Sequence, residues 1–398
     1  MECKDIYENI ADTSLPSIPG VEESLSGEDD FSEQKEFYKC IKLLTGFFPM
    51  DKVDWEAGTY DQYLYDLIKT VLDNYAAGNY QVSYFYAHLI FMSYVYYSVE
   101  KVFQFRPDRM KDVFYPINAY NGRSDKPDIE NYKSVYEFSK IPEKEIFKIF
   151  YVMGMDTSQI HSMSSYISSR DNYAHATGEG NISAEALTQN IMTIKGNMQT
   201  VHKAFFTDFK KQYVQFLLSN VCKSFSDVQN NIEIYISENS LSLFDIQFLT
   251  NKIGLSNIRN ENEEVKRNYR FIKIIHCAFI DYCIENYAST EPDNFKELRS
   301  DMYLQWRYEN NAEEYIEREL KISEYDCVKD GGEFPLFNCP DCDAEQMVYD
   351  EQRKHYHCFG CGKDYSKDEL TRCEDCGVLM HHKDIPLCSE CLEGKLEE

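Results

Sequence analysis

Positive charge is scarce in this chain of 398 residues, in which 41 lysines and arginines stand against 68 aspartates and glutamates, for a formal net charge of -27. A field of this sign repels the phosphate backbone of nucleic acids. The composition therefore excludes a protein that coats DNA or RNA without selectivity. Any contact with nucleic acid must use a small, local site.

Several common enzyme motifs are also missing. The sequence contains no Gly-rich phosphate-binding loop, no G-x-S-x-G nucleophile elbow and no H-E-x-x-H metalloprotease motif. Its first residues, MECKDIYENI, lack the basic and then apolar pattern of a secretory signal. These absences predict a protein that is not secreted and whose chemistry comes from another arrangement of residues.

Long apolar runs are rare, and one stretch, residues 81–99, is free enough of formal charge to raise the question of a membrane span. The stretch contains five Tyr, three Ser, one Gln and one His, which makes insertion into a bilayer unfavourable. We therefore predict a core helix of a soluble protein and no membrane partner.

The pattern of apolar residues predicts an all-α body followed by a small C-terminal module. Residues 1–35 are acidic, rich in Ser and Pro and poor in periodic apolar positions, which is typical of a disordered tail. Helical periodicity follows over 36–225 and over a further helical region, 226–328, whose end includes one long charged helix at 295–320. The stretch KDGGEFP then marks the boundary to the module at 333–398.

Eight of the 14 cysteines fall in this last module as four C-x-x-C pairs, and the other six are scattered along the chain. Two residues between cysteines let both thiolates reach one ion, and two such pairs complete a tetrahedral Zn²⁺ shell. The tail resembles tandem zinc ribbons and predicts two structural Zn²⁺ ions, with ligands Cys339, Cys342, Cys358, Cys361, Cys373, Cys376, Cys388 and Cys391. Paired knuckles and isolated thiols fit a reducing compartment, so we predict a cytoplasmic protein.

Four histidines in the same module are alternative ligands, namely His355, His357, His381 and His382. Each can replace a cysteine in a zinc shell, but four cysteines are already present for each site. We interpret these histidines as residues that do not bind the metal.

Two helices are expected around residue 175. Asp156 can cap the first of them, and Ser183 can cap the second. The second helix carries a seam of apolar residues spaced alternately by four and three, which is typical of lengthwise packing on another helix: Leu187, Ile191, Ile194, Met198, Val201 and Phe205.

Arg170, Asp171 and His175 lie in the polar stretch ISSRDNYAHATGEG at the expected end of the first helix. Asp171 and His175 are four residues apart and share a helix face, so the carboxylate can orient the imidazole. Arg170 lies about 140° away from His175 around a regular helix. One helix alone therefore points them apart, and a second chain in a two-fold dimer can supply the complementary side.

This R-D-N-Y-A-H motif, between two helices of an all-α region, resembles the arginine and histidine motif of HEPN domains. The resemblance covers about residues 80–220 and implies a helical bundle, dimers with two facing motifs, and metal-independent cleavage of RNA. Many members of the family act in antiviral defence or in toxin-antitoxin systems of prokaryotes. The resemblance implies that His175 is the general acid or base, Arg170 the cation that binds the phosphate, and Asp171 the orienting residue, although the family often has Asn at this last position.

The chemistry agrees with this interpretation because RNA carries its own nucleophile, the 2′-OH. Cleavage then needs one group that moves protons near neutral pH and one cation that stabilises the phosphorane. We therefore predict a cytoplasmic endoribonuclease that works as a homodimer across Arg170 and His175, with RNA as substrate.

Three alternatives stay open at this stage. The domain can be an inactive member of the same fold, or the motif can be the ordinary end of an unrelated helix. A third alternative, from another class, is a non-catalytic adaptor whose zinc ribbons bind a protein partner.

Overall fold

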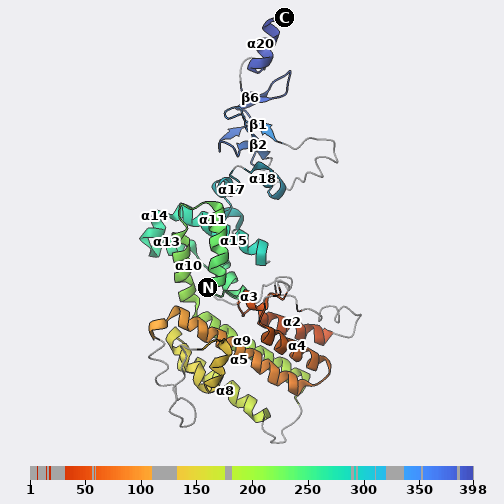
Figure 1. The fold of residues 1–398 in the computed structure, drawn as a ribbon, viewed down its shortest axis with the longest axis vertical. Coiled ribbons are helices and arrows are strands. Elements are labelled where there is room, and N and C mark those ends of the chain that lie inside the picture. Colours follow the sequence, from red (N-terminus) through yellow and green to blue (C-terminus); the bar gives the residue numbers. More distant parts are fainter. Residues whose placement is uncertain are drawn as a thin grey trace. The chain divides into compact units, whose positions relative to one another are not determined.

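The computed structural model describes residues 7, 15, 18, 32–55, 58, 60–109, 132–174, 182–287, 291–292, 295–309, 311–319, 336–350, 353–382 and 386–397 (Figure 1). The chain divides into two compact units, residues 1–293 and 294–398. We describe each unit by itself.

The described elements of the first unit are all helices, joined by turns and loops. Its elements are α2 (Ser32–Thr45), α3 (Met50–Val53), α4 (Gln62–Ala76), α5 (Tyr80–Phe105), η5 (Val135–Lys140), α7 (Glu143–Ile146), η6 (Phe147–Met153), α8 (Thr157–Ala174), α9 (Ala184–Ala204), α10 (Phe206–Ser219), α11 (Phe225–Glu238), α12 (Leu243–Asn251), α13 (Leu255–Glu261), α14 (Glu263–Arg267) and α15 (Tyr269–Tyr287). The prediction of a helical body is confirmed in this coarse form.

Helices α8 and α9 begin where the sequence predicts capping residues. The backbone N–H of Gln159 donates to Asp156 Oδ1 at 2.9 Å at the start of α8, and that of Ala186 donates to Ser183 Oγ at 3.2 Å at the start of α9. Both caps satisfy a backbone N–H that the first helical turn leaves without a partner. The predicted seam of α9 is buried at all six of its positions.

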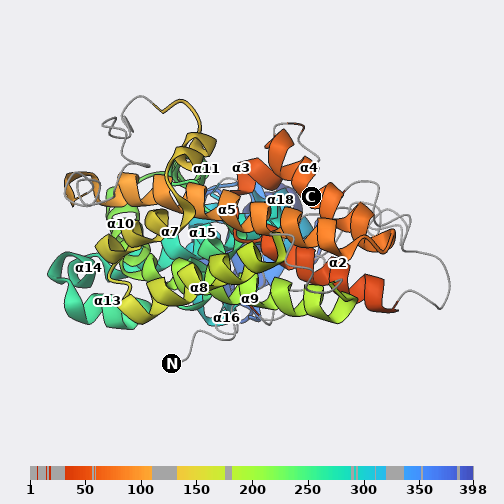
Figure 2. The ribbon, with the colours of Figure 1, turned by 90° about the horizontal axis from the view of Figure 1, so that it is seen from below.

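Helix α5 contains the uncharged stretch 81–99 and lies beside α9, as the two views of the fold show (Figures 1 and 2). Its polar side chains find partners within the core: Ser83 Oγ donates to Val71 O at 2.8 Å, and Tyr94 Oη donates to Met198 O at 3.1 Å. Such bonds remove the cost of burying hydroxyl groups. None of the helices in the described part of the chain has the length and apolar character that crossing a membrane requires.

A buried ionic network joins α5, α9 and α12. The carboxylate of Asp245 is fully buried, with Lys101 Nζ 2.6 Å from one oxygen and His202 Nε2 2.7 Å from the other. Burial alone would raise the pKa of Asp245, but Lys101 and His202 outweigh it and hold this pKa well below its usual range. The network fixes the start of α12, because Asp245 also accepts the backbone N–H of Ser242 at 2.7 Å.

Three residues of the N-terminal segment belong to this core. Tyr7, Leu15 and Ile18 are buried, and Tyr7 Oη lies 2.7 Å from His202 Nδ1. The remaining residues up to 31 lie outside the described part of the chain, so the predicted tail is described at these three positions alone. At these positions the segment is anchored, because three apolar side chains are buried in the core. Their irregular spacing produces no helical period, so the sequence pattern did not reveal them.

Lowering the pH from 7 to 5 is expected to destabilise the first unit by about 2 kcal/mol through His276. This imidazole is buried with its Nδ1 atom 2.8 Å from the hydroxyl of Tyr213, and burial lowers its pKa from 6.5 to about 4. The unfolded chain therefore binds a proton below pH 6.5 while the native state does not, and this stability is lost as the pH falls.

Denaturant unfolding at the two pH values measures this loss. In His276→Gln, the amide can still form a hydrogen bond with the Tyr213 hydroxyl. The difference in unfolding free energy between pH 7 and pH 5 should be smaller by about 2 kcal/mol in this variant. The exposed His161 offers a matched control, and His161→Gln should behave like the wild type. An equal pH dependence in wild type and His276→Gln would contradict the prediction.

The second unit combines short helices with small sheets. Its described elements are α16 (Phe295–Leu298), α17 (Asp301–Arg307), α18 (Ala312–Arg318), β1 (Phe337–Asn338), β2 (Glu345–Asp350), β3 (His355–Cys358), β4 (Asp364–Ser366), β5 (Leu370–Arg372), β6 (Leu379–His381) and α20 (Ser389–Glu397). Strands β1 to β4 form one antiparallel sheet in sequence order, and β5 pairs with β6.

The prediction of one long helix at 295–320 is wrong, since three short helices occupy this range. The side chain of Asn311 accepts the backbone N–H of Glu314 at 3.1 Å and starts a new helix there. Helix α18 packs on β2, where Tyr315 Oη donates to Asp350 Oδ2 at 2.7 Å. These helices therefore group with the strands in the second unit, which begins at residue 294.

Candidate metal centres and the Arg170 cluster

Four cysteine sulfurs meet beside the β1–β4 sheet. Cys339 and Cys342 come from the turn between β1 and β2, Cys358 ends β3, and Cys361 lies in the turn between β3 and β4. All four sulfurs lie within 4.8 Å of one another, with 3.7 Å between Cys339 and Cys361 and 3.6 Å between Cys342 and Cys358. A tetrahedral site with metal–sulfur bonds of about 2.3 Å has sulfur–sulfur edges of about 3.8 Å. The cluster therefore fits a metal ion held by four thiolates.

The second cluster lies around the β5–β6 hairpin and consists of Cys373, Cys376, Cys388 and Cys391. Its sulfurs also lie within 4.8 Å of one another, and those of Cys376 and Cys388 are 3.7 Å apart. Hydrogen bonds from the backbone N–H groups of Cys376 and Cys388 lower the pKa of the Cys373 thiol to about 6. Amides that point at sulfur in this way favour the thiolate, which is the form that binds metal.

Three of the four C-x-x-C pairs share one turn geometry. The residue after the second cysteine has a positive φ of 57°, 70° or 77°, and its N–H donates to the carbonyl of the first cysteine: Asp343, Gly362 and Gly377. Space is tight within the first cluster, because a Cβ on Gly360 would lie 2.9 Å from Ala344 Cβ and 3.5 Å from Cys342 Sγ. The fourth pair differs, since Cys388 directly precedes α20 and Cys391 lies in its first turn.

The histidines of this unit stand outside both clusters. Each group of potential ligands found among the described residues contains cysteines alone. His357 Nδ1 lies 2.6 Å from Asp364, and His381 Nε2 lies 3.0 Å from Asp341. The eight predicted cysteines are thus brought together in two groups of four, which are consistent with two zinc sites.

Arg170 lies near the C-terminal end of α8 with its guanidinium held by two carboxylates. Its Nη2 atom is 2.5 Å from Glu143 Oε2 and 3.1 Å from Asp171 Oδ1. The side chain is 21% exposed, so one edge of the group reaches solvent. Within the described residues no hydrogen bond joins Nε, which is buried, or Nη1. The carboxylates fix the guanidinium through one nitrogen and leave other N–H donors free.

Glu143 connects Arg170 to a buried histidine that the sequence did not single out. His88 on α5 is 1% exposed, and its Nε2 lies 3.0 Å from Glu143 Oε1. Burial would raise the pKa of Glu143, but the hydrogen bond from His88 and the charges of His88, Arg170 and Lys144 outweigh it and lower this pKa below its ordinary value. Glu143 therefore stays ionised at neutral pH and bridges the two side chains.

We call His88, Glu143, Tyr166, Arg170 and Asp171 the Arg170 cluster. Tyr166 lies one helical turn before Arg170, and its ring packs at 5.9 Å from that of His88. The five residues come from α5, α7 and α8. No sequence pattern could have linked them, because 27 residues separate Glu143 from Arg170 and 55 separate it from His88.

The other two predicted site residues have different outcomes. Asp171 is partly exposed and, besides Arg170, contacts Lys144 at a distance of 3.7 Å. His175 lies outside the described residues, directly after the last residue of α8, Ala174. The orientation of His175 by Asp171 therefore stays a prediction.

Comparison of the chain with protein-family models, with curated proteins and with solved structures finds no match. The resemblance to HEPN domains consequently depends on the Arg170 motif and its helical surroundings alone.

Proposed function

We propose that the chain is a metal-independent endoribonuclease in which Arg170 and His175 act on the RNA backbone. The observation that supports this most directly is the state of Arg170. Its guanidinium is anchored by Glu143 at 2.5 Å, remains 21% exposed, and belongs to the helix that ends one residue before His175. An anchored cation with unused N–H donors is suited to a phosphate, which accepts two parallel hydrogen bonds from arginine.

The reaction follows from the chemistry of RNA. The 2′-OH attacks the adjacent phosphorus, His175 moves the proton, and Arg170 stabilises the negative charge that develops on the phosphorane oxygens. The 5′-oxygen leaves, so the products are a 2′,3′-cyclic phosphate and a 5′-OH. Glu143 is a positioning residue in this scheme, since it touches Arg170 and not the substrate.

Two chains complete the site in this proposal. The guanidinium of Arg170 is anchored to Glu143 within its own chain, and on a regular helix His175 would lie about 140° away from it, so His175 of a facing copy supplies the other half of the arrangement. Since Glu143 and Asp171 already place two carboxylates beside Arg170, RNA affinity is modest and depends on few phosphate contacts.

We assign the protein to the cytoplasm of a prokaryote, in antiviral defence or in a toxin-antitoxin system. We also assign one Zn²⁺ to each cysteine cluster.

Chemically altered substrates test the reaction. Single-stranded RNA should be cut with a chelator present that removes free Mg²⁺, and the same oligonucleotide with 2′-deoxy at the scissile position should be inert. Mass spectrometry of the fragments should show the cyclic phosphate. Cleavage that needs added Mg²⁺, or that also occurs at the 2′-deoxy position, would rule out this mechanism.

A second function is favoured by the cysteine clusters. Each has four cysteines and is closed, which suits a structural ion and a surface for a protein partner. On this alternative the helices are a scaffold and the chain is an adaptor. Expression in a bacterial host separates the two, because an active nuclease slows growth and His175→Ala relieves the effect, whereas an adaptor shows no such relief.

A further inference from the structure

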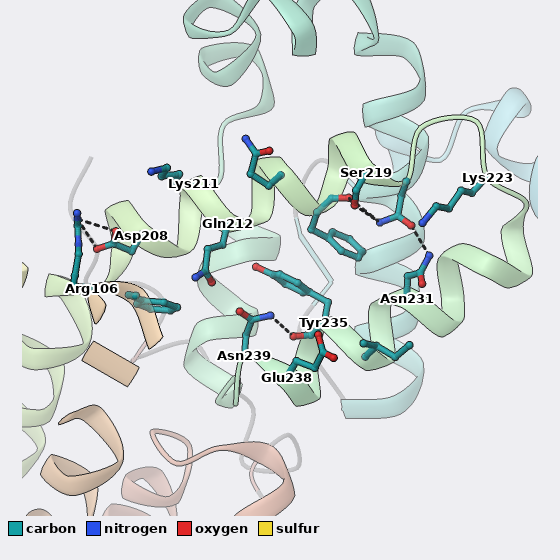
Figure 3. A pocket seen from close by; sticks show the side chains of 15 residues that line it. Arg106, Asp208, Lys211, Gln212, Ser219, Lys223, Asn231, Tyr235, Glu238 and Asn239 are labelled. Atoms are coloured by element: carbon teal, nitrogen blue, oxygen red, sulfur yellow. Dashed lines mark hydrogen bonds and ion pairs between the residues drawn. The ribbon is translucent and has the colours of Figure 1, made fainter. Parts of the chain in front are cut away.

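A pocket of about 570 Å³ lies in the first unit, between α10, α11 and the end of α5 (Figure 3). Its volume is within the range of sites that hold small organic ligands. None of the residues of the Arg170 cluster lines it, so it is separate from the proposed nuclease site.

The centre of the pocket is polar and lacks internal partners. Figure 3 shows Gln212 from α10 converging with Tyr235 and Asn239 from α11 and its cap. Among the described residues, neither the Tyr235 hydroxyl nor Gln212 Oε1 has a hydrogen-bond partner, although both atoms are buried. Tyr235 is 8% exposed. A buried polar atom without a partner costs free energy unless a ligand or water satisfies it.

The hydroxyl of Tyr235 keeps its proton, because burial raises the pKa of this group. It can therefore donate a hydrogen bond, while Gln212 Oε1 accepts one. Asn239 Nδ2 donates to the carbonyl of Tyr235 at 2.8 Å, which leaves its own side-chain oxygen as a further acceptor. The wall of the pocket thus contains both donors and acceptors.

Charge at the rim points to an anion. Arg106 at one end is paired with Asp208 at 2.8 Å, whereas Lys223 at the other end has no ion pair within the described part of the chain. In a protein with a net charge of -27, a cation left free beside an open pocket is a local reversal of the field. Glu238 also lines the pocket, and its carboxylate can accept hydrogen bonds from the hydroxyls of a sugar.

We propose that this pocket binds a nucleotide. The edge of a nucleobase, with adjacent donors and acceptors, meets Gln212, Tyr235 and Asn239. The ribose hydroxyls meet Glu238, and the phosphate meets Lys223. A nucleotide can bind all of these side chains at once. A sugar phosphate lacks the base and a nucleoside lacks the phosphate, so each can bind only some of them.

Calorimetric titration of the full chain tests the proposal with AMP, GMP, CMP and UMP as probes. At least one of them should bind with a Kd of about 1 to 100 µM, and the matching nucleoside and ribose 5-phosphate should each bind about tenfold more weakly or worse. Tyr235→Phe removes a hydroxyl that has no partner among the described residues, so the variant keeps its fold, and its Kd should rise about three- to tenfold.

A matched pair of lysine variants examines the charge. Lys223→Gln should raise the Kd about three- to tenfold, whereas Lys210→Gln, on α10 but paired with Glu261 outside the pocket, should leave it unchanged. Absence of binding by all four nucleotides at roughly 5 mM would overturn the proposal. The same holds for a Kd that Tyr235→Phe does not change, or for binding of acidic dipeptides in place of nucleotides.

Discussion

Replacing Cys358 with serine is expected to remove one of two metal ions per chain and to unfold the β1–β4 sheet. Cys358 is fully buried at the end of β3, where its sulfur lies 3.6 Å from that of Cys342. Serine is a poor ligand for Zn²⁺, and metal binding supplies about 10–16 kcal/mol of folding free energy in structural zinc sites. Without the metal, only a small apolar cluster around Met347 and Tyr356 stabilises the sheet, and it cannot replace this free energy.

Elemental analysis and circular dichroism measure this result together. The wild type should contain two equivalents of zinc and the variant one, while the helical signal of the first unit stays the same. Cys222→Ser is a matched control, because Cys222 is exposed and belongs to neither cluster, and it should retain both ions. One ion or none in the wild-type protein would contradict the assignment of two sites.

The parts of the fold that the sequence predicted are those determined by short-range chemistry. The two cysteines of each C-x-x-C pair are close in sequence, so their spacing predicts that both sulfurs reach one ion. The caps at Asp156 and Ser183, and the apolar seam of α9, likewise follow from the geometry of a single helix.

Features that depend on distant contacts escaped the sequence analysis. The ion pair between Glu143 and Arg170 exists because α7 packs on α8, and nothing in either helix alone reveals it. The range 295–320 reads as one charged helix, yet α18 turns to bury Tyr315 against Asp350. The anchoring of Tyr7 depends on His202, 195 residues away. Tertiary burial decided all three cases, and local periodicity carries no information about it.

A substitution of Arg170 distinguishes a catalytic role from a structural one. In the structural role, the only task of Arg170 is to neutralise the charge of Glu143. Arg170→Lys keeps a cation beside that carboxylate but loses the planar fork that matches a phosphate. We therefore expect Arg170→Lys to remain folded, with a change in unfolding free energy of less than about 1 kcal/mol, and to cleave RNA about 10²-fold more slowly. A purely structural arginine would show the opposite result, with activity retained in proportion to the folded fraction.

Removing the imidazole of His175, the proton-transfer group in the proposed mechanism, should have the largest effect on turnover. We expect His175→Ala to lower the rate of RNA cleavage by about 10²–10⁴-fold, because general acid–base catalysis contributes a factor of this size. Asp171→Asn should have a mild effect on the cleavage rate, since an amide can still orient the imidazole.

Glu143→Gln should lower kcat more than it raises KM, because it frees the guanidinium without removing it. Lys148→Ala, which removes an exposed cation paired with Glu145, is the control and should cleave at the wild-type rate. If His175→Ala cleaves as fast as the wild type while Arg170→Ala only unfolds the protein, then Arg170 serves to neutralise Glu143 and the motif is the ordinary end of a helix.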